Sequence, residues 1–74
     1  MRKLSQKEQR ELDATLSSIE ILEAELATLR LELADADIYQ RSPARANALF
    51  LRDAEIGHAI EAAMARWEEL SERA

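Results

Sequence analysis

Few residues of this sequence could carry out covalent chemistry. The 74 residues include no cysteine, one glycine and one histidine, His58. A single glycine cannot build a phosphate-cradling loop, and a lone histidine at an outward helical position has no nucleophile to activate. The acidic residues are not gathered into a cluster that could hold a metal ion. The sequence therefore predicts no catalytic, cofactor-binding or metal-binding residues, and a chain that is not itself an enzyme.

Basic side chains are the remaining candidates for binding chemistry, and they gather in two segments. Residues 1–10 contain four basic residues and one acidic residue, and residues 38–52 contain three basic residues and no acidic one. The net charge is nevertheless −5, partly because residues 11–37 hold eight acidic residues. Lysine and arginine attract phosphate through salt-sensitive counterion release and need no base-specific contact. The candidates are Arg2, Lys3, Lys7 and Arg10 in the first segment, and Arg41, Arg45 and Arg52 in the second, with Arg30 close by.

The elements that hold these residues are expected to be helices. Ala, Leu, Glu and Arg dominate the sequence, and no part of it has a pattern typical of a strand. A chain of this length has room for one domain with a thin core, which packing alone must stabilise. No apolar run is longer than that of residues 48–51, which is far shorter than the roughly 20 residues that span a bilayer, and the start of the sequence does not resemble a signal peptide. We therefore expect a cytoplasmic protein without a membrane partner.

The first helix is expected over about residues 5–34. Ser5 followed by Glu8 is the pattern of a capping box, in which each side chain bonds the backbone of the other residue. A heptad repeat follows, with six apolar residues among seven seam positions. These a and d positions are Leu12, Thr15, Ile19, Leu22, Leu26, Leu29 and Leu33.

The second helix is expected over about residues 43–72. Ser42 can cap its start, and Pro43 suits the first helical position, where a missing N–H costs nothing. Asp53 is the one charged residue of its seam, and we expect it to turn toward solvent near Arg30 or Arg52. The a and d positions are Leu49, Asp53, Ile56, Ile60, Ala63, Trp67 and Leu70.

The intervening segment, about residues 35–42, is expected to be a turn. Pro43 disfavours a helical conformation at the residue before it, and the aspartates of this stretch compete for backbone N–H groups. Ile38 and Tyr39 are expected to form a short helical turn whose side chains plug the end of the hairpin. The alternative for these two residues is a binding site.

The predicted fold is an all-α, antiparallel two-helix coiled-coil hairpin that occupies residues 1–74 as a single domain. In such a hairpin each a position faces a d position of the other helix. One register sets Thr15 opposite Trp67 and Ile19 opposite Ala63, so that small residues face large ones. The other facing pairs are Leu12 with Leu70, Leu22 with Ile60, Leu26 with Ile56, and Leu33 with Leu49. The flanking ion pairs expected in this register are Glu11 with Arg73 and Glu32 with Arg52.

One apolar stripe of the second helix falls outside this seam. It consists of Phe50, Gly57 and Met64, with Leu16 of the first helix nearby. The simpler explanation is a wide core seam, and the alternative is a docking surface for another hairpin or another domain. A glycine inside a helix costs about 1 kcal/mol relative to alanine, so the close approach of another element would be a natural reason for Gly57.

Three motifs in this order resemble the C-terminal coiled-coil domain of Uup-type members of the ABC-F family of ATP-binding cassette ATPases. They are KLSQKEQREL at residues 3–12, DADIYQRSPAR at residues 35–45 and RWEEL at residues 66–70. The resemblance covers nearly the whole chain. The sequence departs from the family pattern at Gln6, which replaces a tyrosine, at Leu16 and Ala36, which replace prolines, and at Ser42, which replaces an aspartate.

The resemblance implies an accessory domain that follows two ATP-binding cassettes and contributes to DNA binding. ATP and magnesium are expected in the cassettes of the parent ATPase, and no cofactor is expected in this chain. The eight basic residues would then contact phosphates of duplex or branched DNA, or of ribosomal RNA. The alternative is a protein-interaction or ribosome-contacting hairpin that positions the cassettes, with basic residues that only balance the acidic body and keep the chain soluble. We expect the isolated chain to be a monomer or a weak dimer.

Overall fold

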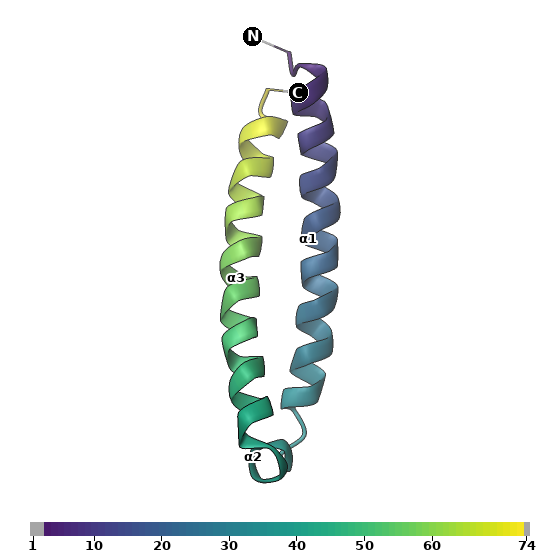
Figure 1. Cartoon of the computed structure of the whole chain (residues 1–74). Helices are drawn as coiled ribbons and strands as arrows, with labels where there is room; N and C mark the ends of the chain where they lie inside the picture. The colour runs from purple at the N-terminus through teal and green to yellow at the C-terminus, as the bar shows by residue number, and fades with distance from the viewer. Residues whose placement is uncertain (1–2, 74) are drawn as a thin grey trace.

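The computed structural model describes residues 3–73, and this part of the chain is helical without any strand. The helices are α1 (Gln6–Leu33), α2 (Ile38–Arg41) and α3 (Pro43–Ser71). Figure 1 shows α1 and α3 side by side and running in opposite directions, in a rod with extents of 56 × 15 × 14 Å. The prediction of an all-α fold is confirmed.

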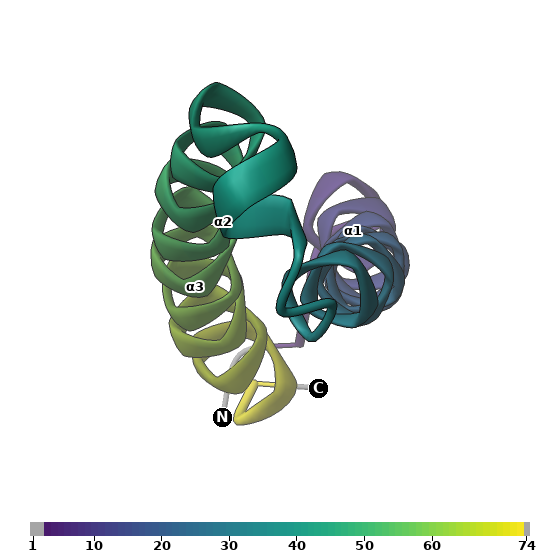
Figure 2. The same cartoon turned by 90° about the horizontal axis from the view of Figure 1, so that it is seen from below.

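The short helix α2 lies at one end of the rod, between the end of α1 and the start of α3 (Figure 1). Figure 2, which looks along the rod from that end, shows α2 against α3, in agreement with the contacts between these two helices. The expected ranges of the long helices, about 5–34 and 43–72, differ from the observed bounds by one residue at most. Neither long helix, over its described residues, has an apolar stretch sufficient to cross a membrane.

The start of α1 is fixed by the predicted capping box. The Ser5 hydroxyl accepts the backbone N–H of Glu8 at 3.1 Å, and the Glu8 carboxylate accepts the backbone N–H of Ser5 at 3.1 Å. Two N–H groups that have no partner inside the helix are thereby bonded. The capping box confirms the helix start that the sequence predicted.

The start of α3 differs from the expectation at Ser42. Pro43 occupies the first turn as predicted, but the Ser42 side chain makes no capping hydrogen bond, so that part of the prediction is wrong. Ser42 also ends α2, and its backbone N–H donates to Ile38 O at 2.9 Å. The short helix therefore fixes the backbone position of Ser42. The C=O of Ser42 in turn accepts the Ala46 N–H at 3.0 Å. The proline lowers the need for a side-chain cap because it carries no N–H.

The turn closes the end of the hairpin through Ile38. Its side chain is buried in one apolar cluster with Leu29, Ala46, Leu49 and Ile56. Tyr39 instead lies outside the cluster with 45% of its surface exposed, and its ring centroid is 5.9 Å from that of Phe50. The plug predicted from both residues is therefore confirmed for Ile38 alone.

The residues assigned to a and d positions form the contact between the long helices. In α1 all seven are buried or half-buried, and in α3 the same holds for all except Trp67. Trp67 retains 37% of its surface exposed, so it lies at the edge of the contact rather than inside it. Asp53 is half-buried and bonds Arg30 at 3.0 Å, which is one of the two partners expected for it.

The apolar stripe of α3 is open to solvent. Phe50 and Met64 are 51% and 49% exposed, and Leu16 of α1 is 46% exposed. A Cβ added to Gly57 would meet no atom within 4 Å. The explanation by a wide core seam is therefore wrong, and no element of the described chain approaches Gly57 closely.

Because Gly57 has open space around it, Gly57→Ala is expected to stabilise the fold. The substitution removes the conformational freedom of a mid-helix glycine, and alanine favours helix by about 0.8–1 kcal/mol. For a domain of this size, the thermal midpoint should rise by roughly 4–8 °C. Thermal unfolding followed by circular dichroism measures this shift. A lower midpoint would mean that the glycine is needed for a close contact after all.

Candidate nucleic-acid interface

The basic residues at the start of the chain lie in the open. Lys3 precedes α1, and Lys7 and Arg10 follow in its first turns, where all three side chains are exposed. None of the three forms an ion pair with another residue of the described range 3–73. Lys7 and Arg10 are three residues apart and so lie on neighbouring faces of one helix. Arg2, the fourth predicted member of this group, lies outside the described residues.

The basic residues near the turn are all engaged by acids. The shortest pairs are Arg30 with Asp53 at 3.0 Å, Arg41 with Asp35 at 3.0 Å, Arg45 with Glu32 at 2.7 Å, and Arg52 with Glu25 at 2.6 Å, and Arg52 also lies 3.9 Å from Glu55. Most of these acids come from α1 or the segment after it, so counting charge along residues 38–52 alone overstates the local positive charge. The fold brings these arginines near one another, but with five carboxylates among them.

Three of the ion pairs form a ladder along one side of the hairpin, with the acid always on α1 and the arginine always on α3. Each is bidentate, with both carboxylate oxygens bonded by one guanidinium group, the geometry of a strong ion pair. The rungs are Glu11–Arg66 at 2.7 and 2.9 Å, Glu25–Arg52 at 2.6 and 2.8 Å, and Glu32–Arg45 at 2.7 and 3.0 Å.

The ladder corrects both of the predicted flanking pairs. Glu11 was expected to pair with Arg73 and Glu32 with Arg52, but each bonds the arginine seven residues earlier in α3. Arg73 bonds Glu8 instead, at 2.8 Å. A heptad repeat places Arg45, Arg52 and Arg66 on one stripe of α3 and extends to Arg73 just beyond its end. Periodicity therefore identifies the face but not which arginine is within reach of a given glutamate. One heptad is a step of about 10 Å along the helix axis.

The ion pairs lower the pKa of their acidic members. Hydrogen bonds from Arg66, Arg52 and Arg45 are the main cause for Glu11, Glu25 and Glu32, and the pKa of each carboxyl lies below its ordinary value. Asp53 beside Arg30 and Asp35 beside Arg41 have a lowered pKa for the same reason. The charged forms of five carboxylates are thus favoured by folding.

Acid is expected to destabilise the hairpin. A carboxyl with a lowered pKa in the folded state binds fewer protons there than in the unfolded chain. Its stabilising effect is therefore present above the ordinary pKa of about 4, and it is lost as the pH falls through the pKa of the folded state. The thermal midpoint should hold between pH 7 and pH 5 and decrease below about pH 4.5. Circular dichroism melts across this range test the prediction, and a midpoint that rises in acid would contradict it.

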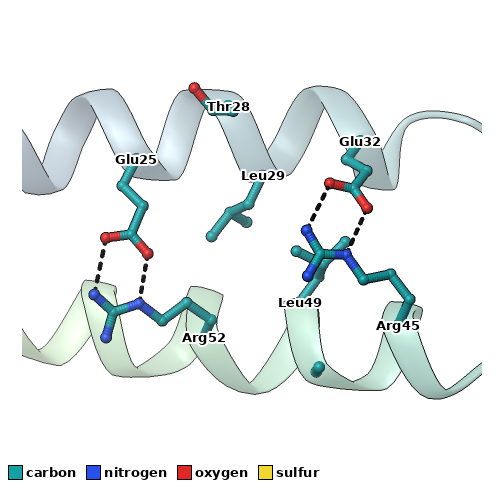
Figure 3. A pocket seen from close by; sticks show the side chains of 8 residues that line it. Glu25, Thr28, Leu29, Glu32, Arg45, Leu49 and Arg52 are labelled. Carbon is teal, nitrogen blue, oxygen red and sulfur yellow. Dashed lines mark hydrogen bonds and ion pairs between the residues drawn. The ribbon is translucent and has the colours of Figure 1, made fainter.

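A groove of about 360 Å3 lies between two rungs of the ladder (Figure 3). The Glu25–Arg52 pair closes one end and the Glu32–Arg45 pair the other, while Leu29 and Leu49 point into the space between the helices. The lining is completed by Thr28 and Ala48. Sequence analysis singled out the two arginines and paired Glu32 with Arg52, but it missed Glu25, although the heptad spacing of Glu25 and Glu32 was a usable signal.

Comparison with known proteins agrees with the sequence motifs. Residues 3–72 match the profile of the family described as ABC transporter C-terminal domain. No solved structure matches the chain.

Two curated relatives come from Haemophilus influenzae strain Rd. The protein named ATP-binding protein Uup-like is 39% identical over 71 residues, and ATP-binding protein Uup is 38% identical over 71 residues. Each match covers 96% of this chain but only 16% and 11% of the respective relative. The chain therefore belongs to the ABC transporter C-terminal domain family, and it is a C-terminal domain of the Uup-type ABC-F proteins that its motifs resemble.

Proposed function

We propose that the chain is an accessory domain that contributes non-sequence-specific DNA binding to a longer cytoplasmic ATPase. The observation that carries this proposal is the group of exposed basic side chains Lys3, Lys7 and Arg10, none of which is paired with another described residue. Arg2 directly precedes this group in the sequence. ATP and magnesium would be bound by the cassettes of the longer protein and not by this chain.

The charge distribution limits where DNA can contact the hairpin. Residues 11–37 hold eight acidic residues and one arginine, so the middle of α1 repels phosphate. Contact is therefore expected at the ends of the rod, first at the open basic group and second at the arginines near the turn. Such contacts position a phosphate backbone and carry no sequence information.

We also infer that α1 and α3 pack as an antiparallel coiled coil. The residues at a and d positions are buried or half-buried in both helices, apart from Trp67, whereas most other positions are exposed. In this arrangement the start of α1 lies beside the end of α3 (Figure 1). The seam would hold the basic start of α1 in place, because the rigid rod fixes the helix on which Lys7 and Arg10 lie.

Titration of labelled duplex and four-way junction DNA tests the proposed function. Binding to both DNAs should be measurable at about 20 mM salt and should weaken strongly at 150 mM. The logarithm of the affinity is expected to fall by roughly 0.9 per neutralised phosphate for each logarithmic unit of salt. Absence of binding at the lower salt concentration would overturn the proposal.

A second candidate function is a protein-interaction or ribosome-contacting hairpin that positions the cassettes. The exposed side chains of Phe50 and Met64 on α3, with the Tyr39 ring 5.9 Å from that of Phe50, favour it because exposed apolar side chains that share one face can form a contact surface. This function predicts that Phe50→Ser and Met64→Ser weaken the contact and leave DNA binding unchanged. Light scattering identifies the partner class: a dimer mass means a second copy, and a monomer mass leaves the stripe open for a different protein.

A further inference from the structure

Three partly exposed apolar side chains lie close together in the half of the rod away from the turn. They are Leu16, Met64 and Trp67, which are 46%, 49% and 37% exposed. Met64 and Trp67 are three residues apart on α3 and are therefore neighbours. Leu16 lies fourteen residues before Arg30, and Trp67 lies fourteen residues after Asp53. Because α1 and α3 are antiparallel (Figure 1), the Arg30–Asp53 bond places Leu16 and Trp67 at the same height.

This apolar patch faces the side of the hairpin opposite the ladder. In a heptad repeat, residues that precede an a position and residues that follow a d position flank the seam on opposite sides. The residues of every rung precede an a position, whereas Leu16 and Met64 each follow a d position. The arginines of the ladder therefore lie on the far side of the seam from the patch.

Four acidic side chains form a rim along both edges of the patch. Each lies three residues before or four residues after Leu16 or Met64, which is the spacing of neighbours on a helix surface. They are Asp13 and Glu20 on α1, and Glu61 and Glu68 on α3, and all four are exposed. Within residues 3–73 none of the four has an ion-pair partner, and Asp13 accepts a hydrogen bond from Gln9 at 3.4 Å. The rim thus differs from the ladder, where an arginine bonds every carboxylate.

We propose that this patch binds a basic amphipathic helix that lies along the rod as a third helix. Apolar residues at the a and d positions of such a partner would cover Leu16, Met64 and Trp67, and its flanking lysines or arginines would meet the two acidic rows. The acids of each row are seven residues apart, which matches basic residues one heptad apart on the partner. The inference does not depend on DNA binding, and it gives the second candidate function a site and a kind of partner.

The acidic rim favours this partner over two other occupants. Four carboxylates within about two helical turns repel phosphate, so the patch is not a DNA contact. A second copy that set its patch against this one would bring two acidic rims together, and like charges that face each other weaken an interface. A basic helix is attracted both by the apolar centre and by the rim. Tryptophan and methionine are also residue types that are enriched at protein contacts.

Titration with two designed peptides tests the proposal. Trp67 is the only tryptophan of the chain, so its fluorescence reports on the patch directly. Each peptide has about three heptads with leucine at the a and d positions, and the e and g positions are all lysine in one and all glutamate in the other. The lysine peptide should shift the Trp67 emission to the blue, because the indole ring leaves water. It should bind at least about tenfold more tightly than the glutamate peptide.

Two charge-matched variants test the role of the rim. Glu20→Gln/Glu61→Gln removes one acid from each row and should weaken binding of the lysine peptide by at least about threefold. Asp37→Asn/Glu55→Gln removes the same charge from exposed positions outside the rim and should change the affinity less than about twofold. An equal loss in the two variants would mean that binding follows net charge, and it would overturn the proposal.

Two further variants test the apolar centre. Leu16→Ser/Met64→Ser should abolish the emission shift at peptide concentrations that saturate the wild type. Ile21→Ser/Leu31→Ser replaces two other exposed aliphatic side chains of α1, which are 68% and 77% exposed, and should leave the shift unchanged. Circular dichroism verifies that each variant retains its helices, so that a loss of folding is not mistaken for a loss of binding.

The remaining outcomes also decide the matter. The absence of an emission shift with either peptide overturns the proposal, and so does equal affinity for both. Light scattering of the chain without peptide tests the rival occupant, because a dimer that Leu16→Ser/Met64→Ser converts into a monomer would mean that a second copy covers the patch. If the lysine peptide binds as expected but DNA does not bind at low salt, the proposed DNA-binding function alone fails.

Discussion

Replacing Ile56 with alanine is expected to lower the free energy of unfolding by about 2–4 kcal/mol. Ile56 is 0% exposed and lies in the apolar cluster with Leu29 and Leu49. The substitution removes apolar contacts and leaves a cavity that two helices can close only in part. A chain of 74 residues has a total stability of roughly 4–11 kcal/mol, so the loss is a large share of it. Urea denaturation followed by circular dichroism measures the change.

Ile21→Ala is the matched control for this prediction. Ile21 has the same side chain, also lies in a long helix, and is 68% exposed on the outer face of α1. Because almost no burial is lost there, the change in unfolding free energy should stay within about 0.5 kcal/mol. If the two substitutions lowered the free energy of unfolding equally, the burial of Ile56 in the core would be contradicted.

Neutralising the open basic group is expected to give the largest effect on DNA binding. The variant Lys3→Gln/Lys7→Gln/Arg10→Gln should lose at least about tenfold in affinity for duplex DNA at low salt, and its salt slope should fall by up to about 3, one unit for each phosphate contact removed. None of these residues pairs with another described residue, so the fold should be retained. Fluorescence anisotropy with a labelled duplex measures both quantities.

A control with the same change in net charge is available in the middle of α1. Ser17→Glu/Ala24→Glu/Ala27→Glu also makes the chain more negative by three charges, and all three positions are exposed. This variant should lose less than about threefold in affinity, because the sites lie away from the basic start of α1, where the main contact is expected. Equal losses would mean that binding responds to net charge alone. Reversal of the arginines near the turn is less informative, since it also breaks their ion pairs.

Local chemistry and periodicity predicted much of the fold. The capping box at Ser5 and the proline at residue 43 act within a few residues, so their effect on the helix ends follows directly from sequence. The heptad repeat identified the inward face of both long helices, because side chains that share a stripe are buried together. Ile38 was recognisable as a plug because it is the one aliphatic side chain larger than alanine in a polar turn.

The features that sequence analysis predicted wrongly depend on how α1 and α3 are offset along the rod, or on ion pairs with residues distant in the sequence. Glu32 has arginines one heptad apart within its stripe, and periodicity cannot decide between Arg45 and Arg52. The positive charge expected near the turn is offset by acids from another part of the sequence. The open space around Gly57 could not be predicted from the local sequence either. It depends on whether another element packs against that face of α3, and none of the described residues does.

The candidate site was predicted in part. Sequence analysis named Lys3, Lys7 and Arg10, and the structure places these three at the same end of the rod, exposed and without ion-pair partners among the described residues. It also named Arg45 and Arg52, but which glutamate bonds each of them, and the groove between them, follow only from the packing of α1 on α3.

Mapping DNA binding on the isotope-labelled chain by NMR tests the central claim most directly. Addition of a short duplex at low salt should cause the largest chemical-shift changes at Lys3, Lys7 and Arg10, with a second set around Arg45 and Arg52. Changes confined to the apolar stripe of Phe50 and Met64, or no changes with DNA in excess, would contradict the account.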